Sequence, residues 1–398
     1  MTTKPLEGIR VVELSTMVAT PSCGRLLAYL GAEVVKIESL DGEPYRQYGG
    51  RTNNNLVIFD LFNSQKKSIS VNAKDPEVNE YVLKLIKTAD VFLTNVREKS
   101  LERLGFSYDK LSKIHPGLVY AHFSGYGATG PMKDLPGYDL TAFFARFGIL
   151  HEFVDPSHEP VNIIPGLGDM ACGMALALNI VSALLNRTKT GKGEKVECAL
   201  NQVGAWMMLM PMAYAQYGES FQRKSGSPPA DIGNDSAKCK DGEYILYAAG
   251  TIPQWKNLCR ALGLHHLIDD PRFRTSSDLF AHGHEVYEEV CAAFLQYDAE
   301  EWVHILREND VPCERHRHLI EISTDEQLLA NRYLCPLSYE DKTITVPVPP
   351  IDFDSVDLFT EQEKGAEQGQ HTKEVLRSLG CPEETIEKML EKGVIIAP

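Results

Sequence analysis

The sequence predicts an α/β fold in two parts: a large domain built on a doubly wound, mainly parallel, Rossmann-like sheet, and a smaller α/β domain. Strand-like and helix-like segments alternate over the first half of the chain, as they do when helices connect parallel strands. The chain has 398 residues, more than one simple core usually holds, which favours two domains. Its composition changes after residue 200, where Met-rich and turn-rich segments follow.

The predicted sheet begins with a strand–helix–strand unit. Residues 9–14 and 33–38 are rich in β-branched residues and predict strands, and residues 21–30 between them predict a helix. Further strands are predicted at 67–71, 90–94, 118–123 and 193–200, and helices at 76–88, 101–114 and 169–185. Ligands bind beyond the carboxyl ends of the strands in such sheets. We therefore expect the loops after the strands, residues 15–20, 39–43, 72–74, 95–97 and 124–127, to face one crevice.

The second half predicts a separate small unit. Residues 223–234 are rich in turn formers and predict a linker or a cover over a site. A strand is predicted at 243–248 and helices near 252–262 and 282–294. The chain then becomes Pro-rich and extended from residue 346, and a helical tail is predicted from 370 to about 390.

Charge and hydropathy argue against nucleic-acid and membrane partners. The 40 Lys and Arg residues are outnumbered by 55 Asp and Glu residues, giving a net charge of −15, and no basic block is present. The longest apolar stretches, 171–185 and 205–215, are shorter than a bilayer requires, so no transmembrane helix is expected. Because no apolar signal region precedes the first strand, we expect a cytoplasmic protein.

The nine cysteines predict neither a metal site nor a disulfide framework. They are scattered as single residues without a Cys-x-x-Cys pair or a His partner at zinc spacing. Unpaired thiols in this number suit a reducing compartment. Cys172 could act as a nucleophile, but nothing near it in the sequence would lower its pKa.

Asp169 is the candidate nucleophile. It lies between Gly166 and Gly168 on one side and a long apolar helix on the other, where unpaired backbone N–H groups favour negative charge. Such a carboxylate is expected to be ionised at neutral pH and could attack an activated acyl group, while the same N–H groups hold the oxyanion. The alternative interpretation is an ordinary helix N-cap, a position that Asp favours.

Other residues have weaker claims to a function. The loop at 15–22 lacks the Gly-x-Gly-x-x-Gly pattern that lets a backbone approach a pyrophosphate, which argues against nicotinamide or flavin binding even though Glu38 ends the second strand. Five histidines could be bases or ligands, but none has a partner at an informative spacing, and surface or structural roles are commoner. These are His282, His284, His316, His318 and His371.

The aromatic residues Phe143, Phe144 and Phe147 and the Met-rich stretch 206–214 have two interpretations. Such clusters are more often core than pocket. If they line a pocket, the acyl group that it binds is apolar.

Several segments in the same order resemble the class III CoA-transferase family, and the resemblance covers nearly the whole chain. They are residues 5–14, 30–38, 63–69, 89–95, Gly125-Tyr-Gly127, Gly168-Asp169, 190–193 and 369–372. The family moves CoA from a thioester to a free carboxylic acid. The resemblance implies that Asp169 attacks the acyl-CoA to give a mixed anhydride, and that the CoA thiolate returns to form an aspartyl-CoA thioester. No permanently bound cofactor is implied, only CoA thioesters as substrates.

Matching positions imply a set of CoA contacts. They are Val18, Ala19, Val71, Lys74, Asn95, Arg97, Arg103, Gly137 and Tyr138. The basic members can neutralise phosphate locally despite the negative net charge. An arginine that some members place after the second strand is Ser39 here, which leaves the adenine end of the site without that contact.

The family's architecture implies a homodimer of two interlocked chains. Residues 1–200 would form the first part of the large CoA-binding domain and 201–224 a linker. Residues 225–330 would form the small domain, and 331–398 would return to complete the large one.

The resemblance also limits the reactions that we expect this chain to catalyse. The segments 136–146 and 161–169 look like the branch of amino-acid-fermenting anaerobes that moves CoA among (R)-2-hydroxy acids and their enoyl acids. Phenyllactate/cinnamate and 2-hydroxyisocaproate/isocaprenoate are the leading pairs. The family also contains α-methylacyl-CoA racemases with a Gly-His-Asp motif, which here reads Gly137-Tyr138-Asp139. A tyrosine is a poor base at neutral pH, so racemisation is the alternative reaction. Binding of acyl-CoA without catalysis is a further alternative.

Overall fold

The computed structural model divides the chain into two compact units. It describes residues 3–47, 51–52, 55–155, 158–159, 161, 163–218, 228–229, 231–360 and 362–398. The larger unit comprises residues 1–151, 160–220 and 326–398, and the smaller one comprises 152–159 and 221–325. Both ends of the chain therefore belong to the larger unit.

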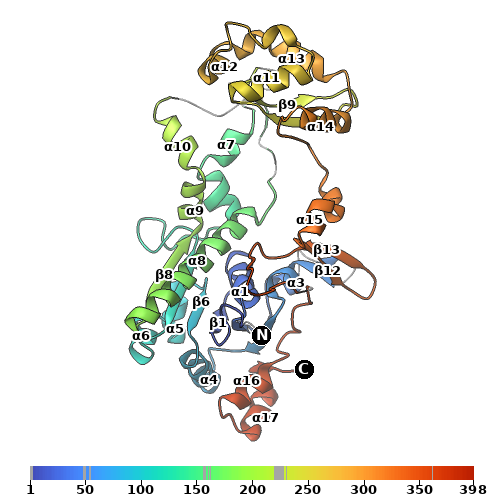
Figure 1. The fold of residues 1–398 in the computed structure, drawn as a ribbon. Helices are drawn as coiled ribbons and strands as arrows, with labels where there is room; N and C mark the ends of the chain where they lie inside the picture. Colours follow the sequence, from blue (N-terminus) through green and yellow to red (C-terminus); the bar gives the residue numbers. More distant parts are fainter. Residues whose placement is uncertain are drawn as a thin grey trace. The chain divides into compact units, whose positions relative to one another are not determined.

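A seven-stranded sheet forms the centre of the larger unit (Figure 1). Its strand order is β14-β5-β2-β1-β6-β7-β8, and every neighbouring pair is parallel except β14 with β5. The strands are β1 (Arg10–Leu14), β2 (Glu33–Glu38), β5 (Lys66–Val71), β6 (Val91–Thr94), β7 (Val119–Ser124), β8 (Lys195–Ala199) and β14 (Ile395–Ile396). The mainly parallel sheet is confirmed, and six of these strands lie within two residues of the predicted ranges.

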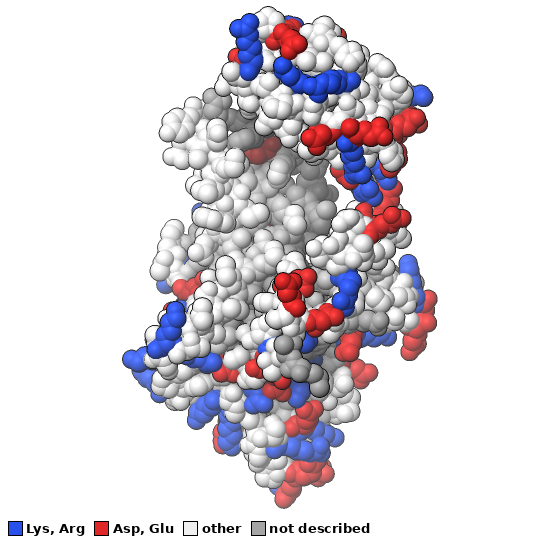
Figure 2. Space-filling view, in the orientation of Figure 1, with Lys and Arg blue, Asp and Glu red and all other residues white. Residues whose placement is uncertain are grey.

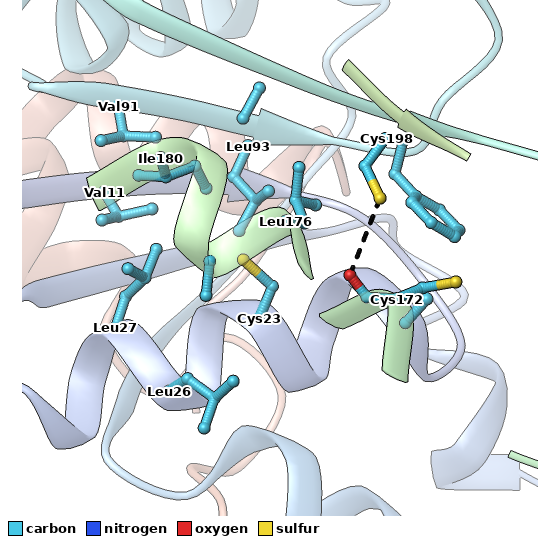
Figure 3. Close-up of a cluster of buried hydrophobic side chains, with 14 of the residues drawn as sticks. Val11, Cys23, Leu26, Leu27, Val91, Leu93, Cys172, Leu176, Ile180 and Cys198 are labelled. Carbon is cyan, nitrogen blue, oxygen red and sulfur yellow. Dashed lines mark hydrogen bonds between the residues drawn. The ribbon is translucent and has the colours of Figure 1, made fainter. Parts of the chain in front are cut away.

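Helices cover both faces of this sheet, so it is doubly wound. On one face, Val11 of β1 packs with α1 (Ala19–Tyr29) and α8 (Leu167–Thr190), as Figure 3 shows. On the other face, Val12 belongs to a second core cluster, which includes residues of α4 (Pro76–Lys87), α5 (Glu98–Leu104), α6 (Tyr108–Ile114), α16 (Thr372–Ser378) and α17 (Glu383–Glu391). Successive strand residues point to opposite faces, which explains the runs of apolar residues in these strands.

Smaller elements complete the larger unit. They are α2 (Pro44–Gln47), β3 (Arg51–Thr52), β4 (Asn55–Leu56), α3 (Val57–Asn63), the π-helix η1 (Asp139–Ala145), α9 (Leu200–Met207), α10 (Leu209–Ala215), α15 (Glu326–Ala330) and the hairpin β12 (Leu334–Ser338) with β13 (Thr343–Pro347). Helix α7 (Ile149–Phe153) begins in the larger unit and ends in the smaller one. Residues 201–215 of the predicted linker are thus helical and belong to the larger unit.

The smaller unit has an antiparallel sheet of order β11-β10-β9. Its strands are β9 (Asn234–Lys238), β10 (Tyr244–Ala248) and β11 (Cys313–Arg315), and its helices are α11 (Ile252–Ala261), α12 (Ser276–His282), α13 (Tyr287–Phe294) and α14 (Ala299–Glu308), with the 3₁₀ turns η2 (His265–Leu267), η3 (Gly283–Glu285) and η4 (Leu319–Thr324). Trp255 and Trp302 are buried at its core.

Three predicted helices are interrupted. Gly105, with φ of 81°, ends α5 in the left-handed region that glycine adopts easily, so the helix predicted at 101–114 is two helices. Residues 282–294 divide into η3 and α13, and the helical tail divides into α16 and α17 around Gly380.

Helix α8 corrects the prediction that no stretch is long enough to span a bilayer. Over Leu167–Thr190 it is long and apolar enough by length and composition alone, because it extends beyond the apolar stretch 171–185 at both ends. In the described structure, Cys172, Leu176 and Ile180 of this helix are buried against the sheet (Figure 3).

Candidate active site

Asp169 lies in the first turn of α8. The residue at the N-cap is Gly166, with φ of 90°, and it makes no side-chain capping bond. The alternative interpretation of Asp169 as an N-cap is therefore wrong. Among the described residues, no hydrogen bond reaches the half-buried Asp169 carboxylate. Its oxygens are thus available to a substrate rather than used to hold the helix end.

The environment of Asp169 raises its pKa to about 7, first because burial disfavours the charged form and second because Asp139 lies nearby. The expectation that this carboxylate is fully ionised at neutral pH is therefore wrong. The helix N-terminus favours the anion, but the loss of water and a like charge outweigh it. A carboxyl group that titrates near neutrality is typical of functional sites.

The π-helix η1 positions the start of α8. Asp139 is buried, and its Oδ2 accepts a hydrogen bond of 2.6 Å from the N–H of Gly166. A Cβ at Gly168 would lie 2.7 Å from the ring of Phe143, so only glycine allows this close approach. Phe143 and Phe144 are buried in the core. The interpretation of these two as core residues holds, and Phe143 also supports the helix that carries Asp169.

A pocket of about 300 Å³ opens at the carboxyl ends of β6 and β7. It is lined by Thr16, Asn95, Arg97, Glu98, His122, Phe123, Ser124, Gly125, Gly127, Ala128, Lys133, Asp134, Leu135, Pro136, Gly137 and Tyr138. Three of the five loops expected at one crevice meet here, those after β1, β6 and β7. Four of the predicted CoA contacts also line it: Asn95, Arg97, Gly137 and Tyr138.

Two glycines allow two loops of the pocket lining to pack closely against each other. A Cβ at Gly125 would lie 2.8 Å from the Cα of Gly137, so two loops touch backbone to backbone. Tyr138 is 59 % exposed at the pocket, and the next residue, Asp139, holds Gly166. The start of η1 therefore connects the pocket with the segment that carries Asp169.

The other five predicted CoA contacts do not line this pocket. Val18 is buried, and its Cγ1 lies 3.9 Å from a Cβ built at Gly166, so it reaches the segment before Asp169. Ala19 is buried at the start of α1. Val71 ends β5 and pairs with Ile395 of β14, Lys74 follows β5, and Arg103 lines a separate hollow.

That separate hollow has a basic wall. It is lined by Asn79, Leu83, Arg103, Leu104, Gly105, Lys110, Lys113 and Ile114. Residues 225–227 and 230 of the predicted cover at 225–233 lie outside the described residues, as do 223 and 224 of the segment 223–234.

Sequence reasoning missed one cluster that the sheet assembles. Ligand atoms of Glu98, His122 and Glu197 lie within 4.8 Å of one another. The Nζ of Lys195 lies 3.0 Å from Glu98 and 2.6 Å from Glu197. Lys195 pairs with both carboxylates, so the cluster is an ion-pair network among the described residues. Lys195 and Glu197 lie two residues apart on β8, but no spacing in the sequence relates them to Glu98 on α5 and His122 on β7.

The thiol of Cys172 is not suited to be a nucleophile. Cys172 is fully buried beside Cys23 and Cys198 (Figure 3), and burial raises its pKa well above the ordinary value. Attack requires a thiolate, which this environment disfavours.

Comparison with known proteins gives consistent results. The model of CoA-transferase family III matches residues 6–372. The (R)-2-hydroxy-4-methylpentanoate CoA-transferase of Clostridioides difficile is 35 % identical, covering 98 % of this chain and 99 % of its own. The cinnamoyl-CoA:phenyllactate CoA-transferase of Clostridium sporogenes is 32 % identical, covering 97 % and 96 %. A CAIB/BAIF family protein from Brucella suis has a similar crystal structure, with a TM-score of 0.81 at 27 % identity over 95 % of this chain and 100 % of that one.

Proposed function

This chain belongs to CoA-transferase family III, and we propose that it moves CoA from an acyl- or enoyl-CoA to an (R)-2-hydroxy acid with an apolar side chain. The support for the activity is the family match over nearly the whole chain. The support for the acid is the 35 % identical relative, whose name specifies (R)-2-hydroxy-4-methylpentanoate, together with the environment of Asp169. Cinnamate/phenyllactate is the second pair, after the relative that is 32 % identical.

The surroundings of Asp169 favour an acid with one carboxylate. The only charge that perturbs its pKa among the described residues is that of Asp139, which is negative. Phe143 and Val18 lie against Gly168 and Gly166. A mouse relative that is 31 % identical is named for succinyl-CoA and glutarate. A dicarboxylate would bring a second negative charge that no described cation beside Asp169 neutralises.

The proposed mechanism uses Asp169 as a nucleophile. An oxygen of its carboxylate attacks the thioester carbonyl, the C–S bond breaks, and the CoA thiolate leaves with the electron pair, giving a mixed anhydride. The thiolate then attacks the aspartyl carbonyl carbon and displaces the donor acid as its carboxylate. The acceptor carboxylate attacks the aspartyl carbonyl of this thioester, the C–S bond breaks, and the CoA thiolate leaves, giving a second mixed anhydride. The thiolate then attacks the carbonyl carbon of the acceptor, which forms the new acyl-CoA and releases the Asp169 carboxylate.

The start of α8 supplies donors for the oxyanion of each step. The first N–H groups of a helix have no partner within the helix. Those of Leu167 and Gly168 lie beside Asp169 at an end that lacks a capping side chain. Such preorganised donors stabilise the charge that develops on a carbonyl oxygen. An anhydride would hydrolyse if water reached it, so a closed site is part of the proposal.

The CoA moiety is proposed to bind in the 300 Å³ pocket. Arg97 and Lys133 lie in its lining and can neutralise phosphate there. Arg103 contributes a positive charge from the neighbouring hollow. Ala19, Val71 and Lys74, at the ends of neighbouring elements, remain proposed contacts.

A second copy of this chain is proposed to cover α8 to α10. Trp206, Met207 and Met210 are 71 %, 60 % and 62 % exposed, and Leu178 of α8 is 68 % exposed. Figure 2 shows few charged side chains over α9 and α10. Contiguous exposed apolar surface of this kind marks an interaction site. An interlocked homodimer, as the family resemblance implies, would bury it.

Covalent trapping tests the function. The protein is mixed with each of a set of acyl-CoAs, treated with hydroxylamine or borohydride, and analysed by peptide mass spectrometry. The expected result is a modification on Asp169, formed fastest with isocaprenoyl-CoA or cinnamoyl-CoA. The absence of an adduct together with exchange of the α-proton in D₂O would instead support the racemase alternative.

A further inference from the structure

The turn that joins β1 to α1 is held by side chains from other elements. The N–H of Thr16 donates to Oδ1 of Asn95 at 3.1 Å, and Nδ2 of Asn95 donates to the Thr16 carbonyl at 2.7 Å. The Ser15 carbonyl accepts from Nζ of Lys36 at 2.9 Å. The N–H of Met17 donates to Oε1 of Glu43 at 2.8 Å. Successive backbone groups of this turn are therefore fixed from outside.

Met17 has a backbone conformation that it would not adopt readily by itself. Its φ is 72°, in the left-handed region that side chains other than those of Gly, Asn and Asp rarely occupy. Such conformations persist when surrounding contacts impose them, and they are concentrated at functional sites. The contact made by the Met17 N–H comes from Glu43.

Burial of the Glu43 carboxylate at this place is energetically unfavourable. It is 1 % exposed, and its Oε2 lies 3.2 Å from Nζ of Lys36 without forming a hydrogen bond to a described residue. Lys36 already bonds Glu13 at 3.0 Å, and Lys66 bonds the other oxygen of Glu13 at 2.8 Å. A buried ion pair with incomplete hydrogen bonding contributes little to folding. Stability alone therefore does not explain Glu43.

The turn lies between the two parts of the candidate site. Thr16 lines the 300 Å³ pocket, while Val18 lies against Gly166, three residues before Asp169. Helix α1 then packs on α8 so closely that a Cβ at Gly173 would overlap the side chain of Ser22. A change in the turn would displace both the pocket wall and the segment that precedes Asp169.

We propose that Glu43 is a positioning residue that holds Met17 in its left-handed conformation, so that the turn fits the CoA thioester. The inference rests on the proposed function, because it takes the pocket as the CoA site. Glu43 acts through Met17 and makes no contact with the substrate.

The test compares Glu43→Ala with the double variant Glu43→Ala/Met17→Gly. Binding of CoA is measured by calorimetry, and KM for the acyl-CoA is measured beside it. Glu43→Ala should weaken CoA binding roughly five- to thirtyfold. Met17→Gly should restore most of this loss, because glycine adopts a positive φ without the steric cost. Glu384→Ala, which alters an exposed ion pair with Lys388, should bind CoA like the unchanged protein.

Each outcome decides the proposal. Equal CoA binding by Glu43→Ala and the unchanged protein would overturn the proposal. A double variant that binds CoA as weakly as Glu43→Ala would also overturn it, because Glu43 would then not act through the conformation of Met17. Should Glu43→Ala not fold by circular dichroism, the same comparison is made with Glu43→Met, which fills the space but has no oxygen to accept the Met17 N–H. If the unchanged protein binds no CoA, the proposed function fails, which is a different result from unaltered binding by the variant.

Discussion

The Asp139 carboxylate accepts a 2.6 Å hydrogen bond from the Gly166 N–H, and the same carboxylate raises the pKa of Asp169 after the larger effect of burial. One buried residue on η1 thus orients the segment before the proposed nucleophile and also disfavours ionisation of that nucleophile. The two effects can be separated by substitution.

Asp169→Ala and Asp169→Asn should both abolish CoA transfer, because neither side chain can form the anhydride. The measurement is transfer of CoA between an acyl-CoA and a free acid, with circular dichroism to check folding. Asp109→Ala is the matched control, since Asp109 also lies in the first turn of a helix of the larger unit. An Asn variant with ordinary turnover would refute the assignment of the nucleophile.

The rate should depend on pH through Asp169. The reactive form is the carboxylate, so kcat/KM should fall as the pH drops below about 7, the pKa of Asp169 in the folded protein. A pH profile of kcat/KM in the free enzyme measures this. A rate that stays constant from pH 8 to pH 5 would contradict it.

Asp169→Asn should make the protein more stable above pH 7. The folded pKa of Asp169 is raised above its ordinary value of 3.8, so the folded state resists ionisation. The resulting destabilisation is absent below the unfolded pKa, grows between the two pKa values and is complete above the folded one. One pKa unit corresponds to about 1.4 kcal/mol, so we expect a gain of more than about 1 kcal/mol at pH 8 and little change at pH 4. Denaturant unfolding at both pH values measures it, and an equal effect at both would contradict the prediction.

Asp139→Asn should separate the two effects of Asp139, its hydrogen bond to Gly166 and its negative charge near Asp169. The amide oxygen can still accept from the Gly166 N–H, while the negative charge that raises the pKa of Asp169 is removed. The midpoint of the pH profile should therefore move to lower pH in Asp139→Asn. Asp139→Ala should lower kcat further, because it also leaves the partly buried Gly166 N–H without its acceptor. Identical midpoints in Asp139→Asn and the unchanged protein would exclude a charge effect.

Glu13→Gln should strongly destabilise the larger unit. Burial alone would raise the pKa of Glu13, but Lys66 and Lys36 lower it below its ordinary value, so the residue is a buried carboxylate with two buried ammonium partners. Breaking a buried pair costs about 3–5 kcal/mol. Glu384→Gln is the control, because its exposed pair with Lys388 is worth at most about 1 kcal/mol. Similar unfolding free energies for the two variants would show that the buried network is not needed for stability.

The sequence by itself determined the parallel sheet and the location of the segment that carries Asp169. Strand β2 was predicted at the residues where it is found, because alternating and apolar strand patterns and helical periodicity are local signals. The glycines around Asp169 likewise indicated a close approach before the helix, and Gly168 makes it with Phe143. The helix predicted at 101–114 is divided because Gly105 has a positive φ, and hydrophobic periodicity does not reveal such an angle.

Only the tertiary structure determined the electrostatics of the site and the contacts that hold its segments in place. Lys36 lies in a strand whose sequence gives no sign that the lysine is buried. Its partners are Glu13, on a neighbouring strand, and Glu43, in the segment after its own strand. The raised pKa of Asp169 depends on burial and on Asp139, thirty residues earlier, which only the packing of η1 against α8 brings near. Charge interactions and desolvation depend on distance and depth in space. Spacing along the chain carries neither of these quantities.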